Sequence, residues 1–383
     1  MTTVGGLTAC LALAGPLAAT AWSAPPAAGW TSVELGTLGG ARTDARDVNE
    51  KGQVVGQSQT ADGRWHAFLW QDGVMTDLTP DARQGMAVAI NDRGEIAGFG
   101  LSEDGTSTQA LRWYRGVRSV LAEEGIAQEI NERGQVAGYQ DHPEMWASTP
   151  FVWTAGTLVD VGPVPVPETF PSSSALDLNR SGAVLGVTET HWDHDVTYVW
   201  RDGVFEILGD GTAPVRGTDL SDRGHVVGHT WDEVPRQVAT LWRDGEVQHL
   251  GTLPGDASSE AAALNEHDVV VGWSQGATPD QTGRQAILWD GELQSLDVVD
   301  DGWSEATEVN DGGQVAGRLG YVRADGTPVQ RVFVWADGTA TRLGGEHEGI
   351  AVTDQTARGH VLVDQYDGAD VRAVLHVPPK RRS

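Results

Sequence analysis

The stretch that decides the fold is residues 49–73, NEKGQVVGQSQTADGRWHAFLWQDG. It contains an Asn-x-x-Gly turn starting at Asn49, a second glycine at Gly56, an apolar run ending at Trp70, and the pair Asp72-Gly73. Similar features recur along the chain from the marker positions Asn49, Asn91, Asn131, Asn179, Ser221, Asn265, Asn310 and Thr356. The markers are 40 to 48 residues apart, and such a period is typical of a solenoid, a propeller or an array.

Each repeat unit, numbered 1 to 8 by its marker, is predicted to form four short strands. The Asn-x-x-Gly turn has the residue preferences of a type I turn, because Asn can hydrogen-bond its own backbone and Gly accepts the exit geometry. Asp-Gly at 72–73, 202–203, 244–245, 290–291 and 337–338 indicates tight hairpins, since both residues tolerate positive φ. No long 3.6-residue periodicity appears. The fold class is therefore predicted to be all-β.

Four antiparallel strands per unit of this length match the blade of a β-propeller. Small residues precede most markers by four places, as Ala45 does, which suits first strands that converge on a channel. Unit 8 lacks a fourth strand, whereas residues 31–38 resemble the fourth strand of unit 5 at residues 246–253. We therefore expect one eight-bladed propeller over residues 31–377, closed by the N-terminal strand completing the last blade.

Composition narrows the function classes. The formal net charge of −28 argues against nucleic-acid binding, which requires a basic face. Residues 1–24 are predicted to include a secretory signal peptide, although a basic n-region is missing, and residues 378–383 a loose basic tail. The only cysteine, Cys10, falls in the first of these segments, so no disulfide framework is expected. We expect an extracellular monomer with no membrane span.

The motifs around residues 35–70 resemble the bacterial HAF-repeat proteins. The resemblance rests on Leu35-Gly36-Thr37-Leu38-Gly39-Gly40, the Asn49 turn and the triplet His66-Ala67-Phe68, and it extends over about residues 31–376. The triplet is intact only in unit 1. The resemblance implies an extracellular β protein without agreed catalytic residues, so no site is transferred.

The variable connections between the second and third strands are the predicted place for ligand binding, because they share one face of a propeller. Tryptophan beside acids and histidine is what a glycan or peptide surface needs. The candidate ligand-binding residues are Trp65, Trp146, Trp192, Trp231, Trp273, Asp141, His142 and Glu144. The alternative is that each tryptophan packs on its own hairpin. The opposite face, formed by tight turns, is expected to be scaffold.

Unit 4 contains two histidines and three carboxylates within seven residues, which suit zinc and similar ions. These candidate metal ligands are Glu189, His191, Asp193, His194 and Asp195. Their spacing matches no motif of known geometry, so solvated loop residues are the competing interpretation. No cofactor beyond a divalent cation is suggested.

Two functions remain at this point. The first is a binding scaffold for a glycan, peptide or protein, without catalysis. The second is a hydrolase or lyase acting on polysaccharide from the same face, with or without a metal, because paired carboxylates serve glycoside hydrolysis. The chain has no Gly-x-Ser-x-Gly or Walker-type phosphate loop, and its one cysteine lies in the expected signal peptide.

Overall fold

The computed structural model describes residues 29–102, 104–142, 147–165, 169–190, 195–209, 214–231, 236–277, 283–299 and 301–379. Within these ranges the chain forms β-strands and no α-helix. No helix there is long and apolar enough to cross a bilayer. The predicted all-β fold is confirmed.

The first two repeat units form separate sheets of four antiparallel strands. Unit 1 comprises β2 (Gly39–Val48), β3 (Val54–Thr60), β4 (Trp65–Gln71) and β5 (Val74–Asp77). Unit 2 comprises β6 (Gly85–Ile90), β7 (Ile96–Leu101), β8 (Thr108–Tyr114) and β9 (Val117–Ala122).

Units 3 and 4 are joined in one eight-stranded sheet by a parallel pairing between Ser148 and Ser172. Unit 3 comprises β10 (Gly125–Ile130), β11 (Val136–His142), β12 (Ala147–Thr154) and β13 (Thr157–Asp160). Unit 4 comprises β14 (Thr169–Leu178), β15 (Val184–Thr190), β16 (Val196–Arg201) and β17 (Val204–Ile207).

The remaining units again form four-stranded sheets. Unit 5 comprises β18 (Val215–Leu220), β19 (Val226–Trp231), β20 (Gln237–Arg243) and β21 (Glu246–Gly251). Unit 6 comprises β22 (Ser258–Leu264), β23 (Val270–Gln275), β24 (Arg284–Trp289) and β25 (Leu293–Ser295). Unit 7 comprises β26 (Trp303–Val309), β27 (Val315–Val322), β28 (Pro328–Ala336) and β29 (Thr339–His347).

The last sheet draws on both ends of the chain. It comprises β30 (Gly349–Gln355), β31 (Val361–Asp367), β32 (Asp370–Val377) and β1 (Thr31–Glu34). β1 pairs antiparallel with β32, with Thr31 opposite Val377 and Glu34 opposite Val374. The predicted pairing of the N-terminal strand with the end of unit 8 is therefore present.

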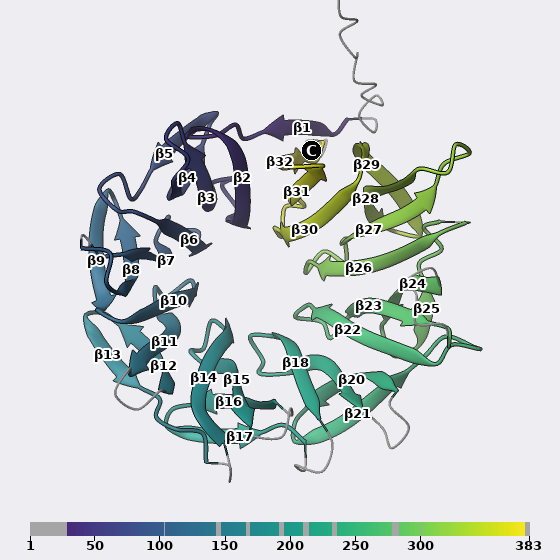
Figure 1. Ribbon diagram of the computed structural model, residues 1–383. Coiled ribbons are helices and arrows are strands. Elements are labelled where there is room, and N and C mark those ends of the chain that lie inside the picture. The colour runs from purple at the N-terminus through teal and green to yellow at the C-terminus, as the bar shows by residue number, and fades with distance from the viewer. Residues whose placement is uncertain are drawn as a thin grey trace, which may run out of the picture.

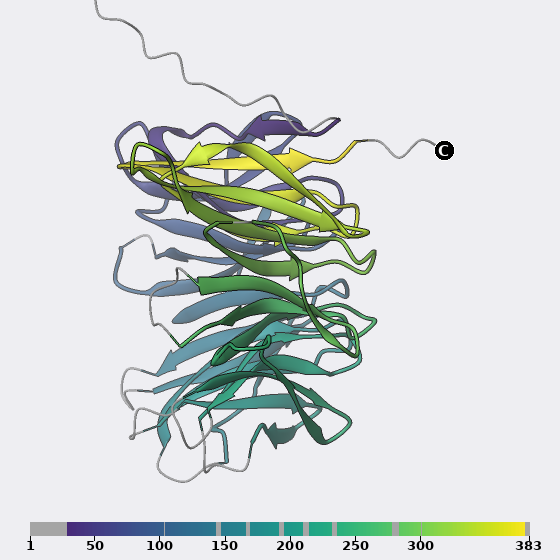
Figure 2. The same cartoon turned by 90° about the vertical axis from the view of Figure 1, so that its right-hand side faces the viewer.

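The sheets are arranged in a ring with the first strand of each unit innermost (Figure 1). Turned by 90°, the ring is seen edge-on, with the strands crossing its thickness (Figure 2). Buried apolar side chains lie between neighbouring sheets rather than at one centre. One such cluster joins Val55 and Ala67 of unit 1 to Ile90, Leu111 and Trp113 of unit 2. This architecture is a β-propeller.

The repeated turn residues have two structural roles. Asn49 Oδ1 accepts hydrogen bonds from the backbone N–H groups of Lys51 and Gln53, as the turn chemistry predicts. Its Nδ2 also donates to the carbonyl oxygen of Asn91, the marker of the next unit, at 3.0 Å. The same bridge recurs from Asn91, Asn131, Asn179, Asn265 and Asn310. The markers thus hold neighbouring units together.

The second glycine of each unit is explained by a close approach. Gly56 pairs with Ala45, and a Cβ on Gly56 would lie 2.1 Å from the backbone oxygen of Asp44. A side chain at position 56 would therefore collide with the backbone of the facing strand. The hairpin prediction is confirmed too, because Asp72 and Gly73 both have positive φ, 51° and 85°.

Unit 5 offers a test of the marker bridge. Ser221 has no amide donor, so it cannot make the bond that Asn179 makes to the carbonyl of the following marker. Ser221→Asn is expected to add that bond to Asn265 and to raise the free energy of unfolding by about 1 kcal/mol. Chemical denaturation would measure it. A stability equal to or below that of the parent would contradict this role of the amide.

Candidate functional site

A groove of about 820 Å³ lies between units 4 and 5. One wall is the last strand of unit 4, β17, with Ile207 and Leu208. The other wall is the sheet of unit 5, from β19, β20 and β21. Leu208, Val215, Val226 and Trp242 belong to the apolar cluster beneath it. The volume falls in the range of ligand pockets.

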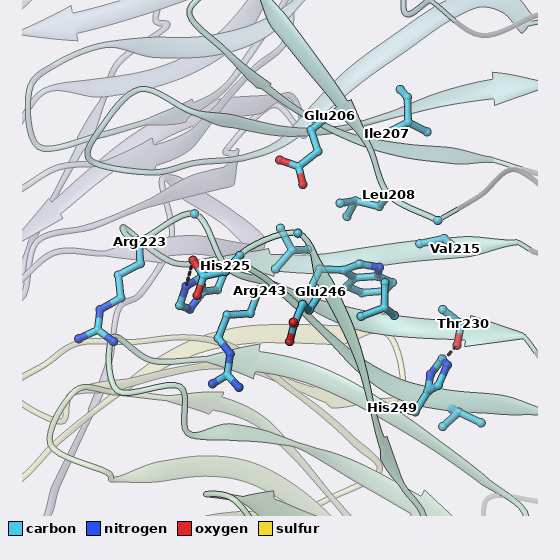
Figure 3. A pocket seen from close by; sticks show the side chains of 18 of the residues that line it. Glu206, Ile207, Leu208, Val215, Arg223, His225, Thr230, Arg243, Glu246 and His249 are labelled. Atoms are coloured by element: carbon cyan, nitrogen blue, oxygen red, sulfur yellow. Dashed lines mark hydrogen bonds and ion pairs between the residues drawn. The ribbon is translucent and has the colours of Figure 1, made fainter.

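The two ends of the groove differ in chemistry. Arg223, His225 and Arg243 lie together at the end formed by the tight turns, whereas Thr230 and His249 lie at the opposite end (Figure 3). His249 Nδ1 is 3.2 Å from Thr240 Oγ1 and 3.4 Å from Thr230 Oγ1. The apolar floor lies between these polar ends.

Trp242 contributes an unpaired hydrogen-bond donor to the groove. In unit 2, the equivalent Trp113 donates its Nε1–H to the carbonyl oxygen of Leu78 at 3.1 Å. Trp242 is 7% exposed, and its buried Nε1 has no acceptor among the described residues. An unmade buried bond costs about 1–3 kcal/mol. A ligand that supplies a carbonyl or carboxylate oxygen here would therefore gain a bond that the protein itself does not make.

Three arginines line the turn end of the groove, and one of them forms an ion pair with a described carboxylate. Arg243 Nη1 lies 3.4 Å from Asp268 Oδ2. Arg201 and Arg223 are exposed and form no ion pair with a described carboxylate. The guanidinium of Arg201 lies against Gly224, where a Cβ would be 2.2 Å from Nη2. Within the described residues, two of the guanidinium groups that line this end therefore have no carboxylate partner.

His225 is held in place beside them. Its Nδ1 is 2.6 Å from Asp268 Oδ1, and its Nε2 is 3.8 Å from Asp244 Oδ1. Burial opposes ionisation of Asp268, but the hydrogen bond and charge of His225, together with Arg243, outweigh it and lower the pKa of Asp268. Asp268 is therefore an ionised carboxylate that is hydrogen-bonded to His225.

The three predicted tryptophans among the described residues, Trp65, Trp231 and Trp273, lie in strands and do not converge. Trp231 ends β19 and lines the loop end of the groove, next to His229 at a ring distance of 4.3 Å. Trp273 is 7% exposed, with the guanidinium of Arg284 4.0 Å from its ring, as the packing alternative describes. Trp65 is half-buried at the start of β4. Trp146 and Trp192 lie outside the described residues.

The other predicted ligand-binding and metal-binding residues do not form one site either. Asp141 lines a second, smaller pocket between units 3 and 4 together with Asp195, whereas His142 Nε2 is 2.8 Å from Thr149 Oγ1. Glu144, His191, Asp193 and His194 lie outside the described residues, as does the side chain of Glu189. No group of three or more metal-ligating side chains occurs in the part of the chain that the structure describes. The metal site stays a prediction.

A group of carboxylates on the innermost strands was not predicted. Six units carry an acid two places before the marker: Asp47, Glu129, Asp177, Asp219, Glu308 and Asp354. Asp177 and Asp219 line a pocket on the tight-turn face, which we expected to be mostly scaffold. Burial, followed by the charge of Asp177, raises the pKa of Asp219 to about 8. The fixed offset from the marker was the signal for this group.

Comparisons with known proteins support the fold. No family model and no curated protein matches the chain. Among solved structures, the chain resembles the β-propeller domain of the Trilobed protease from Pyrococcus furiosus, which is described as having an open velcro topology. The two are 14% identical with a TM-score of 0.50, and the match covers 80% of this chain and 97% of that one. A prolyl endopeptidase is 12% identical with a TM-score of 0.53, covering 87% and 56%. The WD40 domain of SCAP from fission yeast is 11% identical with a TM-score of 0.40, covering 92% and 99%.

The two structures with TM-scores of 0.50 and 0.53 support the β-propeller fold alone. The chain spans just over half of the prolyl endopeptidase. The activities named for these proteins belong to them, and the function of this chain has to be argued from its own groove.

Proposed function

We propose that this protein is an extracellular, eight-bladed propeller of the HAF-repeat type that binds an extended peptide segment in the groove between units 4 and 5. The observation that carries the proposal is the unpaired Nε1–H of Trp242, a residue that lines the groove, whereas the Nε1–H of the equivalent Trp113 in unit 2 has an acceptor. The pairing of β1 with β32 supports eight closed blades. So does the contact of Glu50 in unit 1 with the backbone N–H groups of Ala357 and Arg358 in unit 8.

The shape of the groove favours an extended chain over a compact ligand. The groove follows β19, from Val226 to Trp231, and six strand residues span about 20 Å. Apolar side chains of the ligand would pack on Leu208, Val226 and Trp242, while a peptide carbonyl accepts the indole N–H. Main-chain acceptors combined with side-chain pockets are a common mode of peptide recognition.

The charges of the groove orient the peptide. Arg201 and Arg223 favour an acidic side chain or a terminal carboxylate at the turn end, because charge-assisted bonds to guanidinium are the stronger ones. Glu206 and Glu246 line the groove farther along and can accept from backbone N–H groups or a basic side chain. The preferred ligand is therefore an apolar segment with an acidic group at one end.

A matched pair of tryptophan variants tests the proposal. A heptapeptide library displayed on phage would be selected on the protein, and binding of the selected peptides measured by fluorescence anisotropy. Trp242→Phe is expected to weaken binding about fivefold through one lost hydrogen bond. Trp113→Phe is expected to leave binding unchanged and to cost about 1–3 kcal/mol of stability, because the Leu78 carbonyl loses its donor.

Two further variants locate the peptide. Arg223→Gln is expected to weaken the binding of peptides with an acidic end about tenfold. Trp231→Ala is expected to weaken the binding of the part of the peptide that lies at the loop end. Equal losses in Trp113→Phe and Trp242→Phe, or selected peptides without an acidic group, would reject the groove as the site. Products released from a polysaccharide panel would instead support the hydrolase or lyase alternative.

A further inference from the structure

A second pocket, of about 380 Å³, lies between units 3 and 4 and shares no residue with the groove. It is bounded by β10 and β11 of unit 3 and by β14 of unit 4, close to the point where Ser148 and Ser172 join the two sheets. Its volume is at the lower end of the range for small-ligand sites. Size and place therefore suit one small molecule held between two units.

The residues that line this pocket are polar and rich in acceptors. Asp141 Oδ1 accepts a hydrogen bond from Ser148 Oγ at 2.9 Å, which leaves its second oxygen for a ligand. Asp195 lines the pocket and is exposed, and Ser173 is buried in its wall. Gln128 also lines it, and its buried Oε1 has no donor among the described residues. The pocket therefore needs a ligand that supplies several donors.

The charge of the pocket restricts the ligand further. No lysine, arginine or histidine is among the described residues that line it, while Asp141 and Asp195 carry negative charge. An anionic ligand would be repelled. Burial, with the charge of Asp141 adding to it, raises the pKa of Tyr139. The Tyr139 hydroxyl therefore stays neutral and can donate a hydrogen bond, and the ring that carries it is flat.

From this arrangement we propose that the pocket between units 3 and 4 binds a neutral sugar. Sugar hydroxyls donate to Asp141, Asp195 and Gln128 Oε1 and accept from Ser173 and Tyr139, while the apolar face of the sugar ring lies against the Tyr139 ring. The inference is independent of the peptide groove, because either site can be lost without the other.

The test compares sugars that differ in charge. Glucose, galactose, mannose, xylose, N-acetylglucosamine, cellobiose and maltose would be titrated by saturation-transfer NMR at pH 7, beside glucuronate and galacturonate. We expect at least one neutral sugar to bind, and the uronate of the same stereochemistry to bind at least fivefold more weakly. Gln128→Leu is expected to weaken binding of the neutral sugar about fivefold. Asp141→Asn is expected to reduce the discrimination against the uronate.

Asp202→Asn is the control, because Asp202 is exposed in a hairpin turn and Asn suits its positive φ of 49°. It removes the same charge and should leave sugar binding unchanged. Near-ultraviolet circular dichroism would confirm that each variant is folded. The proposal fails if no neutral sugar binds, if uronates bind equally well, if Gln128→Leu has no effect, or if EDTA abolishes sugar binding and so assigns the pocket to a cation.

Discussion

Removing residues 1–36 is expected to lower the melting temperature by about 3–7 °C and to promote self-association. The deletion removes Leu35, which is 5% exposed in the cluster shared by units 8 and 1, and its backbone N–H bond to the Ala373 carbonyl at 3.0 Å. Loss of a buried leucine alone costs about 2–5 kcal/mol, and with an unfolding entropy of about 2 cal/mol/K per residue each kcal/mol shifts the midpoint by about 1–1.5 °C in a chain of this length.

Self-association follows from the exposed edge. Without β1, the outer edge of β32 from Val374 to Val377 presents unpaired N–H and C=O groups, which is a template for pairing with another chain. Calorimetry and size-exclusion chromatography would measure both effects. Removal of residues 1–28 alone is the control and is expected to change neither. A truncated protein that is monomeric and as stable as the parent would contradict closure by the N-terminal strand.

The second large effect concerns the central carboxylates. Glu129→Gln and Glu308→Gln are each expected to raise the free energy of unfolding at pH 8 by on the order of 1 kcal/mol, with little change at pH 4. Burial first, and then the charges of Asp177, Asp354 and Asp219, raises the pKa of both glutamates well above 4.5. The double variant should gain the most, because the two carboxylates contribute to one field.

The direction follows from proton linkage. A carboxyl whose pKa is raised on folding keeps its proton when the unfolded chain has already lost it, so stability falls as the pH rises from about 4.5 through the folded pKa. A glutamine at this position has no such slope. Buried histidines act in the opposite sense: burial lowers the pKa of His229 and His376 from 6.5 to about 4, which removes stability below pH 6.5.

Denaturant titrations from pH 4 to pH 9 would measure these profiles. Glu292→Gln changes an exposed turn glutamate and serves as the matched control, with the same profile as the parent. We expect greatest stability of the parent near pH 6, between the histidine and carboxylate effects. Parallel profiles for Glu129→Gln, Glu308→Gln and the parent would show that the central acids do not interact across the ring.

Much of the backbone could be read from short segments. Asp72-Gly73 has the positive φ angles that its hairpin requires, and Gly56 faces Ala45 at a point where a Cβ on residue 56 would collide with the backbone oxygen of Asp44. These features depend on residues within about ten positions of one another, so their chemistry is visible in the chain itself. The unpaired Trp242 was not predictable in that way, because its repeat position is the same as that of Trp113.

The candidate sites depended on the spacing between units. Tryptophans and acids chosen for their similar loops turned out to lie apart: Trp231 is in the groove, Trp273 is packed on Arg284, and Asp141 is in the polar pocket. The repeated motif is similar in all of these units and therefore does not distinguish between them. Units 4 and 5, however, have a groove between them, whereas units 3 and 4 are joined by a strand pairing.

By itself, the recurring stretch that begins at Asn49 determined the all-β units, their turns and their number of strands, because turn chemistry and strand alternation act locally. Only the tertiary structure decided what the markers hold: the Asn49 amide reaches the carbonyl of Asn91 in the next unit. It also decided where a ligand can enter, because a pocket depends on how closely two units approach, and that distance is set by contacts between residues far apart in the chain.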